Sequence, residues 1–238
     1  MKSQHAFLVA VSALVVFAAA RLAAGAPAPA AILSTTAITT SLSPSVYGQP
    51  VTFVATVGGA GGPPTGTVQF KTNGANCGNA ATLSATGTAS SAAVSGLGAG
   101  ANTVTAEYSG DGRFSASRGT LAGGQKVNKA DTATAVASFK NPSADGEPVP
   151  FTVMGAATAP GAGTPTGTVQ LKTNSVNCGS AAALTAGQVL FAAVSGLGVG
   201  TNAVTAEYSG DGSFNASSRT LTGGQKVNKA PRGKAAGP

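Results

Sequence analysis

Charge, tryptophan and histidine are scarce or absent in this sequence. Of its 238 residues, 9% are charged, none is tryptophan, and the one histidine is His5, inside an apolar N-terminal stretch. An average soluble domain carries about 25% charged residues. Histidine is the commonest general base and a common neutral metal ligand, so its absence after residue 5 argues against most hydrolytic and metal centres. We therefore expect no catalytic residues, no cofactor and no metal site.

Long apolar runs are also scarce, and the one that stands out is residues 6–20, which follow Lys2 and precede small residues. This is the pattern of a secretory signal peptide. We expect a signal over residues 1–25, cleaved after Gly25 or, as a second candidate, after Ala20. An uncleaved anchor helix is the alternative, although the run is shorter than the ~20 residues that a span needs. The protein is thus predicted to be secreted or on the cell surface, with no membrane span after cleavage and a Pro/Ala linker over residues 26–34.

Basic residues outnumber acidic ones, and the net charge is +7. The densest basic stretch is diluted by glycine and proline and contains Lys226, Lys229, Arg232 and Lys234. Nucleic-acid binding needs clustered cations with interleaved aromatic rings. We therefore predict a flexible basic tail over residues 230–238 and no nucleic-acid partner.

The two cysteines, Cys77 and Cys178, stand at matching points of a sequence repetition. A disulfide needs Cα atoms within about 7 Å, which equivalent points of consecutive domains do not offer. Two interpretations remain open for an exported chain. Each cysteine is a half-buried small apolar residue, or each forms a disulfide with a second chain.

That repetition is the strongest positive signal in the sequence. Residues 94–112 recur at 194–212 with changes only at Ala99, Ala101 and Thr103, and GGQKVNKA recurs unchanged at 123–130 and 223–230. A period of 100 residues matches a self-sufficient domain rather than a solenoid unit. We therefore expect two tandem domains, over residues 35–129 and 130–229, here called the first and second repeat.

Within each repeat, short β-branched segments alternate with Gly, Pro and Asn. This pattern predicts strands rather than helices, and seven of them in about 95 residues are typical of an all-β immunoglobulin-like sandwich. The inward face is predicted to carry Val51, Phe53, Ala55 and Val57 in one strand and Val104, Ala106 and Tyr108 in another. The strands are expected at residues 35–43, 51–57, 67–71, 80–84, 88–94, 102–108 and 124–128.

The repeats differ at positions that carry further predictions. Pro150 replaces Thr52 within a strand, so that strand is expected to be an edge or to be bulged. Leu190 and its neighbours replace SSAAV of the first repeat, which predicts a better-filled second core. The loops after Gly58 and Gly155 are the most divergent, and variable contacts are expected there.

Several motifs in fixed order resemble the bacterial Ig-like domains of the group 3 type. They are PSVYGQPVTFVATV, PTGTVQFK and GANTVTAEYSGDGRFSAS in the first repeat, and GEPVPFTV, PTGTVQLK and GTNAVTAEYSGDGSFNASS in the second. The resemblance covers nearly all of residues 35–229. It implies structural spacers and adhesion modules of bacterial envelope proteins, and it brings no catalytic residues with it.

The YSGDG segment, which begins at Tyr108, allows two interpretations. Gly110, Asp111 and Gly112 suit a turn in which glycines accept positive φ and aspartate caps the backbone, and Phe114 returns the chain to the core. Alternatively Glu107 and Asp111 are calcium ligands, but calcium needs six to eight oxygens. A second cation candidate lies at the start of the second repeat and comprises Asp131, Asp145 and Glu147.

Three functions compete at this point. A non-catalytic envelope spacer or adhesion module is favoured. A carbohydrate- or protein-ligand module is the alternative, with envelope polysaccharide or surface proteins as partners; Tyr47, which the second repeat replaces with Asp145, is its candidate ligand contact. Catalysis without histidine would need an activated lysine. Lys71 and Lys172 are expected to point outward into solvent, which disfavours that role.

Overall fold

The computed structural model describes residues 30–230. Strands and turns account for this part of the chain, and it holds no helix of the length and apolarity that a membrane crossing requires. The predicted signal peptide, its cleavage sites and almost all of the predicted basic tail lie outside the described residues.

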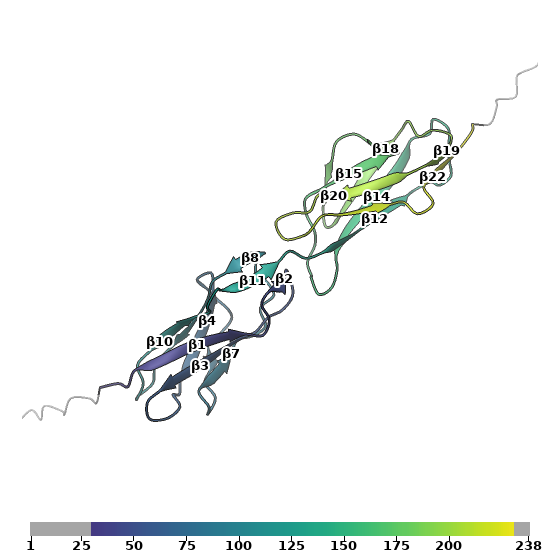
Figure 1. The fold of residues 1–238 in the computed structure, drawn as a ribbon. Coiled ribbons are helices and arrows are strands. Elements are labelled where there is room, and N and C mark those ends of the chain that lie inside the picture. Colours follow the sequence, from purple (N-terminus) through teal and green to yellow (C-terminus); the bar gives the residue numbers. More distant parts are fainter. Residues whose placement is uncertain (1–29, 231–238) are drawn as a thin grey trace, which may run out of the picture. The chain divides into compact units, whose positions relative to one another are not determined.

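Three small sheets build the first repeat (Figure 1). Their strand orders are β1-β3-β7, β10-β9-β4-β5 with β6 also paired to β4, and β2-β11-β8. The final strand β11 runs parallel to the short β2 and antiparallel to β8, which closes one side of the sandwich. The strands are β1 (Ser34–Thr40), β2 (Ser45–Val46), β3 (Phe53–Gly59), β4 (Thr67–Thr72), β5 (Ala75–Asn76), β6 (Ala81–Thr82), β7 (Thr88–Ser90), β8 (Gly100–Asn102), β9 (Val104–Tyr108), β10 (Ser117–Thr120) and β11 (Gln125–Asn128).

The second repeat has the same plan, with sheets β12-β14-β18, β16-β15-β20-β21 with β17 on β15, and β13-β22-β19. Each sheet has its counterpart in the first repeat, so two tandem all-β sandwiches are confirmed. The strands are β12 (Thr132–Ser138), β13 (Ser143–Ala144), β14 (Val149–Ala157), β15 (Thr168–Thr173), β16 (Val176–Asn177), β17 (Ala182–Ala183), β18 (Gln188–Val194), β19 (Gly200–Asn202), β20 (Val204–Tyr208), β21 (Ser217–Thr220) and β22 (Gln225–Asn228).

The core of the first repeat lies where the predicted inward faces meet. Both predicted sets are confirmed, since every member is at most 2% exposed. They pack in one cluster with Val68 and Phe70 of β4 and with Phe114. Alternation with period two brings these side chains to one face of each strand. Burying a large apolar side chain contributes about 1.5–3 kcal/mol relative to leaving it exposed, so this cluster is the main stabilising element of the fold.

Some predicted boundaries are wrong. Strand β10 was not expected, because Ser117–Thr120 is polar and mostly solvent-accessible and so lacks an alternating apolar signal. The predicted linker over residues 26–34 extends too far, because Ser34 already begins β1. Before it, Ile32 forms a parallel bridge with Phe114 and packs on the core. Ile32 is therefore part of the first domain and not of the linker, because its apolar side chain is partly buried against the core.

Pro150 lies in a central strand, so the predicted edge position is wrong. The predicted bulge is confirmed, because the register between β14 and β18 shifts between Val149 and Phe151. The same offset occurs in the first repeat, where Val51 pairs with Val94 but Val54 pairs with Ser90. The bulge is therefore part of the fold. Pro150 itself faces β12 just beyond the end of that strand, where its carbonyl accepts the N–H of Phe139. The equivalent N–H of Thr52 bonds only the Ser41 side chain, so the proline removes no backbone–backbone ladder bond.

Leu190 does not fill the second core, contrary to the expectation from sequence. Its side chain is 57% exposed on the outer face of β18, whereas Val189 and Phe191 on either side pack against the core. Strand alternation decides this outcome, because of three consecutive apolar residues the middle one must face outward. Only part of the extra apolar sequence therefore enters the interior.

Candidate functional site

The YSGDG turn of the first repeat is a hydrogen-bonded cap. One carboxylate oxygen of Asp111 accepts the backbone N–H groups of Arg113 (2.8 Å) and Phe114 (2.7 Å). The other accepts the N–H and the hydroxyl of Thr65, each at 2.8 Å. The N–H groups of Thr65, Arg113 and Phe114 hold the pKa of this carboxyl well below its usual range. Asp111 therefore ties the β9–β10 turn to the start of β4, as turn capping predicted.

Asp211 repeats the cap in the second repeat. It accepts the N–H groups of Ser213 (2.7 Å), Phe214 (2.9 Å) and Thr166 (2.9 Å), together with the Thr166 hydroxyl. Desolvation opposes ionisation here, but the side-chain bond from Thr166 and the three N–H groups outweigh it, and the pKa falls to about 2. The phenol of Tyr208 beside it has its pKa raised to about 12, first by burial and then by the Asp211 charge.

The glycines of this turn have different roles. Gly110 has φ of +79°, and a Cβ there would lie 2.9 Å from the backbone nitrogen of Ala116, so glycine is required. Gly112 has no positive φ, so that prediction is wrong, and a Cβ added there would meet no other heavy atom within 4 Å. Phe114 and Phe214 enter the two cores as expected.

The GGQKVNKA segment, identical in both repeats, contains a buried glutamine whose role the sequence did not reveal. Gln125 is fully buried; its Oε1 accepts the Thr40 hydroxyl at 2.7 Å, and its Nε2 donates to Leu42 O (2.8 Å) and Ser45 Oγ (3.2 Å). Gln225 makes the corresponding contacts with Ser138, Lys140 and Ser143. This amide fastens the last strand of each repeat to its first. Identity in both repeats was the one available signal, but a glutamine surrounded by polar residues does not predict burial.

A pair of asparagines also links separate segments of the chain. They lie near the start of β9, whereas the Asp111 turn follows its end. Asn73 Nδ2 donates to Asn102 Oδ1 at 2.9 Å, and Asn73 Oδ1 accepts the N–H of Thr103. Asn102 in turn donates to Gly98 O at 2.8 Å. The second repeat reproduces this arrangement with Asn174 and Asn202. These asparagines therefore connect the β4–β5 turn to the end of β8 and to Thr103, the residue before β9.

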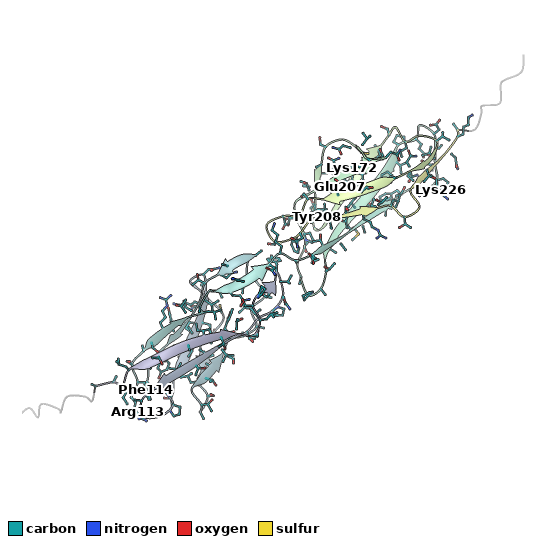
Figure 2. The ribbon with its side chains drawn as sticks, in the orientation of Figure 1. Arg113, Phe114, Lys172, Glu207, Tyr208 and Lys226 are labelled. Atoms are coloured by element: carbon teal, nitrogen blue, oxygen red, sulfur yellow. The ribbon has the colours of Figure 1, made fainter. Side chains whose placement is uncertain are left out.

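The two strand-end lysines form ion pairs. Lys71 Nζ lies 2.7 Å from Glu107 Oε2, and Lys172 Nζ lies 2.7 Å from Glu207 Oε2. Figure 2 shows Lys172 and Glu207 side by side on adjacent strands. The hydrogen bond from Lys71 lowers the pKa of Glu107. Both lysines point outward as expected, and each is neutralised by a carboxylate rather than placed in an apolar pocket.

Tyr47 is not an isolated ring on the surface. It is half-buried and lies edge-on to the ring of Phe214, with centroids 5.2 Å apart and an interplanar angle of 78°. Its backbone N–H donates to Asn128 O at 2.8 Å. The candidate ligand contact Tyr47 therefore already packs against another aromatic ring.

The cysteines are free in the structure and partly buried. Cys77 Sγ donates to Thr72 Oγ1 at 3.3 Å, and Cys178 Sγ donates to Thr173 Oγ1 at the same distance. Both side chains pack beside the cores. A disulfide to a second chain stays a prediction.

Two of the three acidic residues considered as cation ligands at the start of the second repeat have other partners. Asp131 Oδ1 accepts the Asn215 amide at 2.8 Å, while Glu147 pairs with Lys140 and accepts the Ala144 N–H. Within residues 30–230, no group of three or more His, Cys, Asp or Glu side chains is placed to share an ion. Asp131 and Glu147 thus take part in hydrogen bonds within the second repeat.

The second repeat also carries an open groove of about 600 Å³ between the β15–β16 hairpin and β18. It is lined by backbone and small side chains together with Val176, Cys178, Phe191 and Val194. Sequence reasoning did not find this feature, since its walls come from segments that are far apart in the chain.

Comparisons with known proteins follow the same division into repeats. A model of the bacterial Ig-like domain (group 3) matches residues 38–128 and again residues 130–225. A search among curated proteins found no match.

Solved structures of low sequence identity also match this chain. The adhesin InvE of Yersinia pseudotuberculosis is 13% identical, covers 79% of this chain and 58% of its own, and has a TM-score of 0.39. The Hoc capsid protein domains of bacteriophage RB49 are 13% identical, over 82% of this chain and 59% of theirs, with a TM-score of 0.34. The Escherichia coli adhesin FdeC is 11% identical, over 82% and 63%, with a TM-score of 0.33.

This chain therefore spans less than two thirds of each of these three structures. The family match is the stronger finding, because it covers both repeats almost from the first strand to the last. The chain belongs to the bacterial Ig-like domain (group 3) family.

Proposed function

We propose that this protein is a non-catalytic, exported pair of Ig-like domains that serves as a spacer and adhesion module of a bacterial cell envelope. The observation that carries the proposal is the use of the residues common to both repeats. Asp111, Gln125 and Asn102, with their second-repeat counterparts, hold turns and strands together by buried or capping hydrogen bonds. The side chains that the two repeats share therefore stabilise the fold. This is expected of a structural module that is used in tandem copies.

Electrostatics supports the non-catalytic part of this proposal. The carboxylates with the most strongly lowered pKa values, Asp111 and Asp211, remain ionised caps and face backbone N–H groups rather than a nucleophile. Lys71 and Lys172 each pair with a glutamate of the neighbouring strand and do not lie in an apolar pocket. Neither arrangement prepares a group for proton transfer.

Fractionation of the native host into cytoplasm, periplasm, envelope and medium tests the export and envelope assignment. We expect the protein in the envelope or medium, shortened at its N-terminus relative to the translated sequence, and accessible to protease added to intact cells. A full-length cytoplasmic protein would overturn the proposal. Reproducible turnover in a hydrolase screen of purified protein would overturn its non-catalytic part.

Ligand binding is the second candidate function, and Tyr47 is its candidate contact because its side chain is only partly buried. A glycan or matrix-protein array probed with the purified protein tests it. Loss of a signal in Tyr47→Phe would implicate the hydroxyl, and loss in Tyr47→Ala with retention in Tyr47→Phe would implicate ring stacking. Absence of any signal on both arrays would count against this second function.

A further inference from the structure

The outer face of the β12-β14-β18 sheet carries three large exposed apolar side chains in the second repeat, at positions that are polar in the first. Phe139, Met154 and Leu190 are 67%, 55% and 57% exposed. Ser41, Thr56 and Ser90 occupy the equivalent positions in the first repeat. Phe139 and Leu190 line one shallow depression with Thr152, and Met154 follows on the same face of β14. Large apolar side chains grouped on one surface are characteristic of interaction sites.

Strand β18 is also an edge strand of its sheet, and it is longer than β7, its counterpart in the first repeat. It runs over Gln188–Val194, whereas β7 ends at Ser90, and it pairs with β14 along one side. Gly155 N–H donates to Gly187 O, so the alternation of antiparallel bonds directs the backbone groups of Val189 and Phe191 toward β14. The N–H and C=O groups of the residues between and beyond them, Leu190 and Ala192, therefore face the open edge.

In the first repeat this edge is shortened by a serine. Ser91 occupies the position of Phe191, and its hydroxyl accepts the N–H of Phe53 at 3.0 Å and donates to Ala92 O at 2.7 Å. The strand ends there. Replacement of SS by LF in the second repeat thus extends the strand and adds an apolar side chain to each of its faces. Long apolar edge strands are templates for pairing with another strand.

The residues that line this surface indicate which kind of partner it can bind. The groove of about 600 Å³ beside β18 and the depression around Leu190 are lined entirely by uncharged residues. They offer a partner backbone hydrogen bonds and apolar contacts, and no charged group. The matching partner is an uncharged extended strand rich in apolar residues, and Gln188–Val194, a glutamine followed by six apolar residues, has this composition itself.

We propose that β18 pairs antiparallel with β18 of a second molecule of this protein and joins their two sheets into one. In this register Leu190 of one molecule lies opposite Ala192 of the other, and each such pair exchanges its free N–H and C=O groups. The apolar patch around Leu190, Phe139 and Met154 is then continuous across both molecules. No charges of like sign are opposed, so the association is driven by strand addition and apolar contact.

Sedimentation velocity of the purified protein under reducing conditions, from about 1 μM to about 1 mM, tests this proposal. We expect a reversible dimer whose dissociation constant rises at least tenfold in Leu190→Lys. Val199→Lys is the matched control, because Val199 is equally exposed at 56% but lies before β19, away from the edge. Both variants add the same charge, so only position distinguishes them.

Thiol labelling supplies a second readout on the unmutated protein. Cys178 lines the groove beside β18, and Cys77 is its counterpart in the first repeat. We expect maleimide labelling of Cys178 to slow as concentration rises, while labelling of Cys77 does not change. A monomer at every concentration, or a dimer that Leu190→Lys and Val199→Lys affect equally, would overturn the proposal and leave the spacer function untouched.

Discussion

The carboxylate of Asp111 lies 2.8 Å from the backbone nitrogen of Thr65, although 46 residues separate the two in the chain. Asp211 and Thr166 repeat this relationship at 2.9 Å in the second repeat. The YSGDG turn is therefore a long-range clamp as well as a local one. It joins the turn after β9 to the start of β4, its partner in the same sheet.

This clamp predicts a loss of stability in acid. The folded pKa of Asp211 is about 2, below the value of about 3.9 that an unfolded aspartate has. A depressed folded pKa contributes stability that is complete above the unfolded value and is lost as pH falls toward the folded value. We expect the melting temperature of the second repeat to fall between about pH 4 and pH 2. Calorimetry across this range measures it.

Asp211→Asn should lower the melting temperature at neutral pH and flatten its dependence on pH. Asp145→Asn, at an exposed turn position, is the control and should keep the slope of the unmutated protein. An unchanged slope in Asp211→Asn would show that other groups produce the acid sensitivity.

Replacing either buried glutamine is predicted to lower the free energy of unfolding of its own repeat by a similar amount. Gln125→Ala leaves Thr40 Oγ1, Leu42 O and Ser45 Oγ without the amide that they contact. Buried polar groups deprived of a partner cost about 1–3 kcal/mol. We expect a loss of that size in the free energy of unfolding of the first repeat in urea, and a similar loss in the second for Gln225→Ala. Full stability of both variants would contradict a structural role for this amide.

Gly119 predicts a steric effect confined to the first repeat. A Cβ at this position would lie 2.3 Å from Thr36 O, whereas the second repeat has an exposed Arg219 at the equivalent place. Overpacking of this kind costs about 1–3 kcal/mol, and Gly119→Ala should destabilise the first repeat by that amount in urea unfolding. Gly112→Ala is the control, with no atom within 4 Å of the added carbon and no positive φ. Equal stabilities of the two variants would rule out the close approach at Gly119.

The two tyrosine hydroxyls predict unequal effects. Tyr108 OH donates to Thr65 O at 2.7 Å, while Tyr208 OH reaches Asp211 Oδ2 at 3.3 Å. A typical hydrogen bond contributes about 0.5–1.5 kcal/mol net. Tyr108→Phe should therefore lower the free energy of unfolding by about that much, and Tyr208→Phe by less. The reverse order in urea unfolding would contradict this difference in geometry.

Sequence patterns predicted the fold well where burial alternates. The inward faces of β3 and β9 follow from β-branched and aromatic residues at every second position, and the turn at Asp111 follows from its glycines. Strand β10 and the buried Gln125 could not be predicted in this way. One is a polar strand that its neighbours β9 and β1 hold in place, and the other is a polar side chain whose partners lie about 80 residues earlier.

Two repeats of one all-β domain could be predicted from the sequence, because the 100-residue repetition and the strand alternation can be seen in the order of residues without any knowledge of their contacts. In β18, where apolar residues are consecutive, the tertiary structure was needed to show which of them are interior. Leu190 was expected in the core, but its neighbours Val189 and Phe191 occupy the inward positions, and the pleat turns Leu190 out to solvent. Pairing of β18 with β14 on one side leaves the other edge open beyond Gln188, which bridges to Thr185, and only the assembled sheet shows this.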